Sequence, residues 1–409
     1  MGMLARIAWR NIWRNKRRSW VLISAISIGV FCFVGSMTFA DGFSIQLVNT
    51  SIELDGGHIQ LSSSGYSDNP TIRSRIRNLG YVEDALDQTL LARYSPQVVT
   101  SGMVNSAEQA SGVRLVGVDP LRERGVSSIP ERIVEGEYLS SGVVDGEVVI
   151  GVSLADRLNV TVGEKIVVMV SDLENEVSAG AYRVRGLFTT NSAEYDRMMV
   201  FVHLDEARRL LGYSTEEAST ISVHLDPEVD LKTSAAALRG RLTDVPVDVL
   251  TWEDRMPMLV LMRQTYDVFS VALVLILFSA ISFSIINSFL MVIFERIREI
   301  GIMSANGLRP MQIFSMLYLE AAFIVILGLL VGGIVAAGLV AWWAETGLDL
   351  SAFAEGMRSF NLGTVIYPYV DWRHIWTGVI TIFIVVFLSV LYPAFKASRF
   401  RAVEAINYV

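Results

Sequence analysis

The sequence contains very little cysteine and little histidine. Of its 409 residues one is cysteine, Cys32, and four are histidine. A single cysteine excludes a disulfide within the chain, so a domain outside a membrane must be held by its own apolar core. The histidines are scattered, and none stands at metal-ligand spacing with the cysteine. We therefore expect no metal site and no cofactor in this chain.

Motifs for nucleotide binding and for nucleophilic catalysis are also missing. There is no phosphate loop of the form G-x-x-x-x-G-K-S/T, which excludes ATP hydrolysis by that route, and no G-x-G-x-x-G after a predicted strand. The segment GVSLA at 151–155 lacks the last glycine of a nucleophile elbow. No Asp, Lys, Arg or His lies in the interior of the long apolar runs, which argues against an ion-coupled transporter or pump. We therefore expect that the chain is not an enzyme.

Long apolar runs dominate the sequence. The mean hydropathy is +0.44 and 52% of the residues are hydrophobic, a composition typical of membrane proteins. A helix needs about 20 apolar residues to cross a bilayer, and four runs are long enough: 20–40, 266–294, 316–343 and 374–394. The second run is longer than a bilayer requires, so we predict that 263–294 forms a transmembrane helix with a stalk outside the membrane.

The third run holds two features of its own. Gly328 and Gly332 form a GxxxG pattern, which lets two helices approach closely, either within one subunit or between two. Glu320 lies near one end of the run, where a carboxylate at the membrane interface is tolerable. The sequence leaves both packing alternatives for the glycines open.

The charges divide the chain between the two sides of the membrane. Residues 1–19 hold six Lys and Arg and no acid, and basic residues also occur in 295–314 and 395–409. Residues 41–262 hold 33 Asp and Glu but 19 Lys and Arg, a net charge of −14. Because basic segments stay on the cytoplasmic side, we place both termini and 295–314 in the cytoplasm. Residues 41–262 and the loop 344–371 then lie on the other side of the membrane, outside the cytoplasm.

The segments 1–19 and 41–262 have their own predicted folds. In 1–19, Trp9 and Trp13 share one helical face while arginines occupy another, which predicts an amphipathic helix in the cytoplasmic headgroups. In 41–262, short β-branched runs alternate with helical segments such as 204–213, which predicts an α+β domain. The predicted fold is thus an α-helical membrane protein with four transmembrane helices (1 + 3) and a large α+β extracytoplasmic domain between the first and second.

The segment ERIREIGIMSANGLRPMQIF at 295–314 connects the second and third runs. Its charges alternate in sign, Gly307 is suited to a left-handed helix end, and Pro310 is suited to the first turn of the next helix. This segment resembles the cytoplasmic loop of the MacB/FtsX/LolC–LolE superfamily of ABC-transporter permeases. The start IAWRNIWRNKRRS, the outer segments VRLVGVDP and IVEGEYL, and the ending YPAFKASRFRAVEAINYV resemble the same superfamily in the same order. Within it, the chain resembles the lipoprotein-releasing, LolC/LolE-like branch without a fused ATPase.

The resemblance implies a permease of the bacterial inner membrane that works with other chains. Two copies of a cytoplasmic ABC ATPase would bind the ATP and Mg²⁺, and a second permease chain would complete a homodimer or a heterodimer. The permease would turn ATP hydrolysis into conformational change of the periplasmic domain and extract lipoproteins or another lipidic cargo, with a periplasmic carrier or adaptor protein as a further partner and no nucleic acid. Two alternatives stay open: a MacB-like efflux permease, and an FtsX-like signalling module that acts on a periplasmic protein.

The resemblance also assigns residues. In the family, the segment corresponding to 295–314 is a coupling helix that docks into the ATPase, and the matching positions here are Glu295, Arg296, Arg298, Glu299, Ile300, Gly301 and Gly307. Arg399 and Arg401 would support this contact at the cytoplasmic face. Six apolar residues of the first two runs are candidates to line cargo access from the membrane: Phe31, Phe33, Met37, Phe39, Phe269 and Leu273. Ordinary packing between helices is the alternative for these six side chains.

Overall fold

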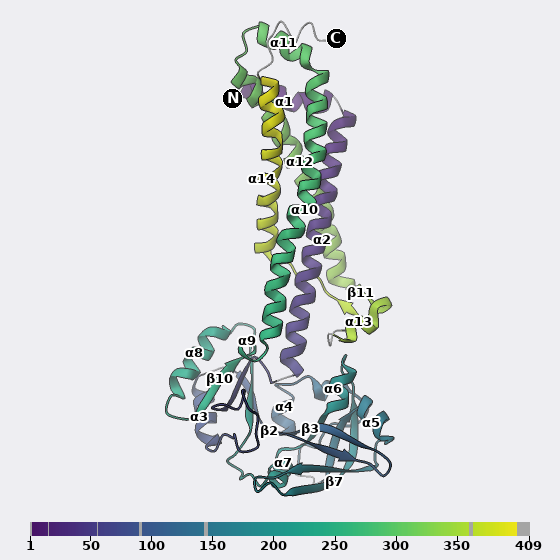
Figure 1. The fold of residues 1–409 in the computed structure, drawn as a ribbon, viewed down its shortest axis with the longest axis vertical. Coiled ribbons are helices and arrows are strands. Elements are labelled where there is room, and N and C mark those ends of the chain that lie inside the picture. Colours follow the sequence, from purple (N-terminus) through teal and green to yellow (C-terminus); the bar gives the residue numbers. More distant parts are fainter. Residues whose placement is uncertain are drawn as a thin grey trace. The chain divides into compact units, whose positions relative to one another are not determined.

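The computed structural model describes residues 2–14, 16–54, 56–89, 92–142, 146–359 and 363–398. These residues form two compact units (Figure 1). The helical unit comprises the described residues within 1–45, 262–349 and 365–409, and the α+β unit comprises those within 46–261 and 350–364. Two long helices, α2 (Lys16–Leu54) and α10 (Pro257–Glu295), contribute residues to both units.

The helical unit is built on four long apolar helices. Besides α2 and α10, these are α12 (Pro310–Thr346) and α14 (Trp372–Ser398). Among the described residues, four helical stretches are long and apolar enough to cross a membrane: Ser19–Leu54, Pro257–Glu295, Pro310–Thr346 and Trp372–Ser398. The prediction of four transmembrane helices in a 1 + 3 arrangement is therefore confirmed, and each helix extends beyond the apolar run that predicted it.

Shorter elements complete the helical unit. They are α1 (Gly2–Arg14), α11 (Ile297–Ala305) and the antiparallel pair β11 (Leu348–Asp349) and β12 (Val365–Ile366). Gly307 follows α11 with φ of +89°, a conformation that residues with a side chain adopt only under strain. Pro310 is the first residue of α12, where its missing N–H costs no hydrogen bond. The sharp turn between α11 and α12 thus has the residues that its geometry requires.

The core of the helical unit is apolar, and glycines bring its helices close together. Phe33 of α2 and Phe278 of α10 are almost fully buried, and their rings meet edge to face with centroids 6.3 Å apart. Gly328 of α12 lies against Ile26 of α2, to which an added Cβ would come within 2.6 Å. Gly332 lies against the same helix one turn later. The GxxxG pattern therefore packs two helices of one subunit.

The α+β unit contains a ten-stranded sheet and several helices. The strands are β1 (Ile59–Ser63), β2 (Ala92–Asn105), β3 (Ala110–Val118), β4 (Ile133–Gly136), β5 (Glu147–Gly151), β6 (Lys165–Ser171), β7 (Val177–Phe188), β8 (Met199–His203), β9 (Thr220–Leu225) and β10 (Val247–Thr251). The helices are α3 (Leu79–Thr89), α4 (Pro120–Glu123), α5 (Val152–Leu158), α6 (Ala193–Met198), α7 (Leu204–Leu211), α8 (Leu231–Arg241), α9 (Trp252–Arg255) and α13 (Ala354–Ser359). The sheet order is β10-β1-β9-β2-β3-β8-β5-β7-β4, and β6 pairs with both β2 and β7.

Strand β2 joins two parts of this sheet because it is 14 residues long. Its first part, Ala92 to Gln97, pairs with β9, and its second part, Gln97 to Asn105, pairs with β3. One apolar core lies between β1, β9 and the helices α3 and α8, and another lies between strands β5 to β8 and the helices α5 and α7. The pairs β3/β8 and β5/β7 are parallel. Strands mixed with packed helices confirm the α+β prediction.

Candidate coupling site

The segment predicted to couple to an ATPase forms the end of α10, the helix α11 and the turn after it. The predicted residues divide by exposure. Those on the outside are Glu295, Arg298, Glu299 and Gly307, and those that are buried are Arg296, Ile300 and Gly301. Ile300 packs into the apolar core of the helical unit. One face of the segment is therefore anchored in this unit, and the other is open to solvent or to another chain.

Glu299 joins α11 to the N-terminal helix α1. Its Oε2 accepts a hydrogen bond from Arg14 Nη2 at 2.6 Å and another from Arg296 Nε at 3.1 Å. Burial raises the pKa of the Glu299 carboxyl, but the hydrogen bond from Arg14 and the charge of Arg296 outweigh it, so the pKa lies below its usual value. Because the Arg14 and Glu299 side chains are 50% and 49% exposed, this pair by itself contributes little to stability.

Arg296 continues the connection into α12. Its Nη1 lies 3.5 Å from Glu320 Oε1, and Asn11 Nδ2 of α1 donates to Glu320 Oε2 at 3.5 Å. The side chains of Arg296 and Glu320 are only 10% and 8% exposed, so the charge of Glu320 depends on Arg296 for compensation, while Arg296 also has Glu299. A polar network of five residues thus ties α11 to α1 and α12: Asn11, Arg14, Arg296, Glu299 and Glu320.

Helix α1 also packs on α12 through apolar contacts. Ala8 and Ile12 are buried, and the ring of Trp9 meets that of Phe323 edge to face with centroids 5.4 Å apart. The hydroxyl of Ser19 donates to the carbonyl of Ile12 at 2.8 Å, which fixes the start of α2 against α1. The predicted helix in 1–19 is present, and its apolar face covers α12. Its location in lipid headgroups stays a prediction.

The six candidates for cargo access do not share one surface. Phe33 and Met37 are buried in the core of the helical unit, and the Phe33 ring lies directly against Gly378 of α14. Phe31 and Phe39 of α2 are partly exposed. The exposed members on α10 are Phe269 and Leu273. Packing within the helical unit thus accounts for Phe33 and Met37. A contact with cargo stays a prediction for the other four candidates.

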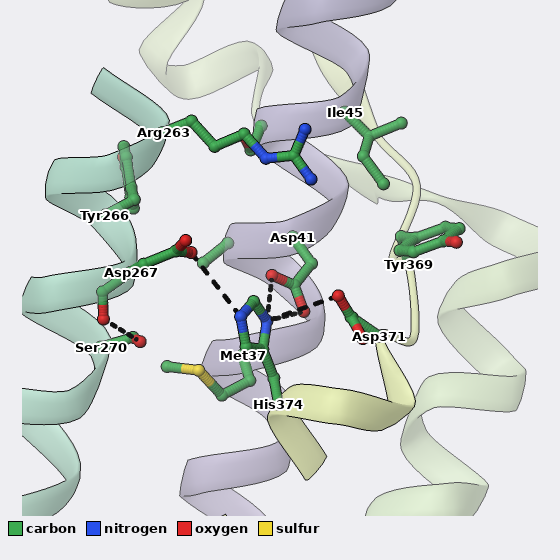
Figure 2. Close-up of a pocket in the computed structure, with 12 residues that line it drawn as sticks. Met37, Asp41, Ile45, Arg263, Tyr266, Asp267, Ser270, Tyr369, Asp371 and His374 are labelled. Atoms are coloured by element: carbon green, nitrogen blue, oxygen red, sulfur yellow. Dashed lines mark hydrogen bonds and ion pairs between the residues drawn. The ribbon is translucent and has the colours of Figure 1, made fainter. Parts of the chain in front are cut away.

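A second polar cluster lies in the helical unit around His374 of α14, in a cavity of about 120 Å³ (Figure 2). The imidazole Nδ1 is 2.9 Å from an oxygen of Asp41 on α2, and Nε2 is 3.6 Å from an oxygen of Asp267 on α10. Asp371, just before α14, comes within 4.0 Å of Nδ1. One imidazole therefore bridges carboxylates on the two helices that contribute to both units.

Two family descriptions match the chain. Residues 19–241 match the MacB-like periplasmic core domain, and residues 270–402 match the FtsX-like permease C-terminal domain. The chain belongs to the MacB/FtsX family of ABC-transporter permeases. Such permeases are the membrane components of transporters and generally work with a cytoplasmic ATPase. With its four apolar helices, this permease is a multi-pass protein of the inner membrane.

Several known proteins are similar to this permease. The lipoprotein-releasing system transmembrane protein LolC of Neisseria meningitidis is 24% identical over 95% of this chain and 93% of its own length. The pyoverdine export ATP-binding/permease protein PvdT of Pseudomonas fluorescens is 26% identical over 85% of this chain and 54% of its own length. The periplasmic region of MacB from Actinobacillus actinomycetemcomitans is a similar solved structure, with a TM-score of 0.38 and 12% identity over 54% of this chain and 97% of that structure.

The polar network of the permease includes three residues that the sequence analysis did not assign to the site: Asn11, Arg14 and Glu320. Glu320, which lies near one end of its apolar run, is 6% exposed and is paired with Arg296 inside the helical unit, and its depth at the membrane interface stays a prediction. The sequence did contain a signal for Glu320, because a carboxylate within an apolar run normally has a polar or charged partner inside the protein. Arg399 and Arg401, predicted to support the ATPase contact, lie outside the described residues.

Proposed function

We propose that this permease converts ATP hydrolysis by a separate ATPase into movement of its α+β domain and thereby extracts lipoproteins from the inner membrane. Two ATPase copies, which hold the ATP and Mg²⁺, dock at α11 on the cytoplasmic side. A second permease chain completes the transporter. The α+β domain faces the periplasm, where a carrier or adaptor protein receives the cargo.

The polar network is the observation that supports this mechanism best. A force applied to α11 reaches α1 through Glu299 and reaches α12 through Arg296, because both carboxylate contacts are charge-assisted. α10 ends at Glu295, next to Arg296, and contributes residues to the α+β unit at its other end. A displacement of α11 therefore has a continuous helix along which it can act.

The similarity to LolC supports the choice of cargo. It covers 95% of this chain and 93% of the Neisseria protein, which is described as part of a lipoprotein-releasing system. The chain spans about half the length of PvdT, 54%, at a comparable identity of 26%. The PvdT similarity favours an efflux permease as the second candidate function, with a small molecule or peptide as cargo.

The ATPase contact can be tested by exchanging the charges of one ion pair. Glu299→Arg places a third cation beside Arg14 and Arg296 and removes an acid from the outer face of α11, so it should lower both co-purification of the ATPase and its stimulated turnover. The double exchange Arg14→Glu with Glu299→Arg restores the ion pair with reversed polarity. We expect the double variant to recover thermal stability but not ATPase binding, because the outer face keeps the wrong charge.

Two results would count against the docking assignment. If Glu299→Arg leaves ATPase retention and turnover unchanged, α11 is not the docking element. If the double exchange restores ATPase binding together with stability, Glu299 acts only inside the permease. A reversal of a comparable exposed ion pair in the α+β unit, Arg93→Asp with Asp226→Arg, is the matched control and should change neither property.

The cargo requires its own experiment. The permease with its ATPase is reconstituted in vesicles that contain a radiolabelled lipoprotein, and release into the supernatant is measured with ATP and with a non-hydrolysable analogue. The proposal expects ATP-dependent release in the presence of a soluble acceptor. An efflux permease would leave the lipoprotein in the vesicles while its ATPase is still stimulated.

A further inference from the structure

A cavity lined by methionine lies within the α+β unit. Its volume is about 510 Å³, within the range of roughly 300–1,000 Å³ typical of small-molecule sites. Four methionines line it: Met198, Met199, Met256 and Met258. Met258 is 68% exposed and Met198 is 44% exposed, so apolar surface is open to an incoming molecule. Flexible, polarisable methionine side chains adapt to chains of varying shape.

The charge of the cavity is opposite to that of the segment that contains it. Residues 41–262 carry a net charge of −14, yet the described residues lining the cavity include two arginines and no Asp or Glu. Arg255 donates from Nη2 to the carbonyl of Gly57 at 2.8 Å, which holds its guanidinium in place. Arg114 of β3 is exposed, and the described residues give it no carboxylate partner. Arg114 also borders a second cavity whose lining includes Glu53 and Glu123, but within the described residues it forms no ion pair with either. A cation without an ion-pair partner beside an apolar wall suits an amphiphile with a negative head.

We propose that this cavity binds one acyl chain of an anionic lipid, with the chain among the four methionines and the phosphate of the head group at Arg114. The acyl chain is held by dispersion and by the burial of apolar surface. Each methylene removed from water raises the affinity about fourfold. The guanidinium of Arg114 presents several N–H donors to the phosphate oxygens, a geometry that favours phosphate over a neutral head. The inference rests on the cavity alone and holds for either cargo class of the permease.

The test uses the full-length permease in phosphatidylcholine nanodiscs and a photoreactive lysophosphatidylglycerol whose reactive group ends its acyl chain. After irradiation, labelled peptides are identified by mass spectrometry. We expect label on the peptides that contain 198–199 and 256–258. Unlabelled lysophosphatidylglycerol should compete at least tenfold better than lysophosphatidylcholine of the same chain length, and glycerol phosphate without a chain should not compete.

Variants separate the two parts of the site. Met258→Glu should lower labelling at least tenfold, whereas Met258→Leu, which keeps the apolar volume, should retain it. Arg114→Gln should abolish the preference for the anionic head while labelling by the chain persists. The matched controls are Met103→Glu, an exposed methionine of β2 outside the cavity, and Arg157→Gln, an exposed arginine of α5. Each variant is compared at equal thermal stability, and Met198→Gln is measured as a second variant of the part of the site that holds the chain.

Three outcomes would overturn the proposal. Label confined to the parts of the four long helices that belong to the helical unit, within 19–45, 262–295, 310–346 and 372–398, would show that the lipid stays in the bilayer and does not enter the cavity. Equal competition by the anionic and the zwitterionic lysolipid would show that Arg114 does not distinguish between the two head groups. Unchanged labelling in both Met258→Glu and Met198→Gln would place the chain elsewhere.

Discussion

The buried pair of Arg296 and Glu320 gives a prediction whose size follows from the geometry. The charged atoms are 3.5 Å apart, and both side chains are about nine-tenths buried. With an effective dielectric constant of about 20, this separation corresponds to an attraction of about 5 kcal/mol. Desolvation of the two ions offsets most of that gain, so the intact pair adds little. Removing Arg296 leaves the Glu320 charge buried without compensation, which costs about 3–5 kcal/mol, whereas removing Glu320 leaves Arg296 paired with Glu299.

The perturbation is a double-mutant cycle. Glu320→Gln keeps an acceptor for Asn11 and leaves Arg296 with Glu299 as its remaining acid, so we expect a smaller loss, of about 1–2 kcal/mol. Arg296→Met leaves Glu320 as the uncompensated buried ion and should cost about 3 kcal/mol or more. The double variant Arg296→Met with Glu320→Met buries apolar groups of similar size, so its stability should return to within about 1 kcal/mol of the wild type.

The assay is thermal unfolding of the purified permease in detergent, with reconstituted ATPase stimulation as a second readout. A positive coupling energy of about 2 kcal/mol or more in the cycle would support the pair as described. If both single variants unfold within about 0.5 kcal/mol of the wild type, the two charges are hydrated and the network is not a buried connection. If the double variant loses as much unfolding free energy as the two single variants together, the two residues act independently.

Three further predictions concern packing, pH and the second cluster. Gly378→Ala should cost about 1–3 kcal/mol, because its Cβ would overlap the ring of Phe33, whereas Gly333→Ala, with open space around it, should be neutral in the same melting experiment. Burial and a neighbouring imidazole lower the pKa of His58 from 6.5 to about 4, so the unfolded chain takes up a proton first as the pH falls. Unfolding free energy should therefore drop between pH 6.5 and 4, by about 1–2 kcal/mol after allowance for partial exposure, and His58→Asn should weaken this dependence, with the part due to His224, whose pKa burial also lowers, remaining. His374→Leu leaves its carboxylate partner on α2 without a hydrogen bond, and a loss of about 1–3 kcal/mol is expected by thermal unfolding, with His374→Asn partly restoring it.

The membrane helices could be predicted because their signal is local. Each apolar residue of a run such as 316–343 adds to the same free energy of insertion, whatever lies elsewhere in the chain. The turn at Gly307 and Pro310 was also predictable, since each residue suits its backbone position by its own chemistry. The α+β class followed from the alternation of short strands and helices.

The sheet order and the polar network could not be predicted in the same way. The strand β1 lies between β9 and β10, which occur far later in the chain, so its position depends on which long-range pairing buries the most apolar surface. Asn11 and Glu320 are 309 positions apart, and nothing near either residue indicates the other. The sequence shows that Glu320 is an acid in an apolar run, but its partner is decided by how α1 and α11 fold back on α12.

The proposed coupling segment has two different faces on α11. Arg296 and Ile300 face inward, where a buried ion pair and apolar packing hold the segment to the rest of the helical unit. Arg298 and Ile302 are exposed and stand four residues apart, so they are neighbours on one face of the helix. An exposed apolar residue beside a cation is a surface that another protein can bury at a gain. We infer that the inward residues determine how well the segment transmits a displacement, whereas the outward residues determine how tightly an ATPase binds, because a helix with only the outward face would dock without moving anything.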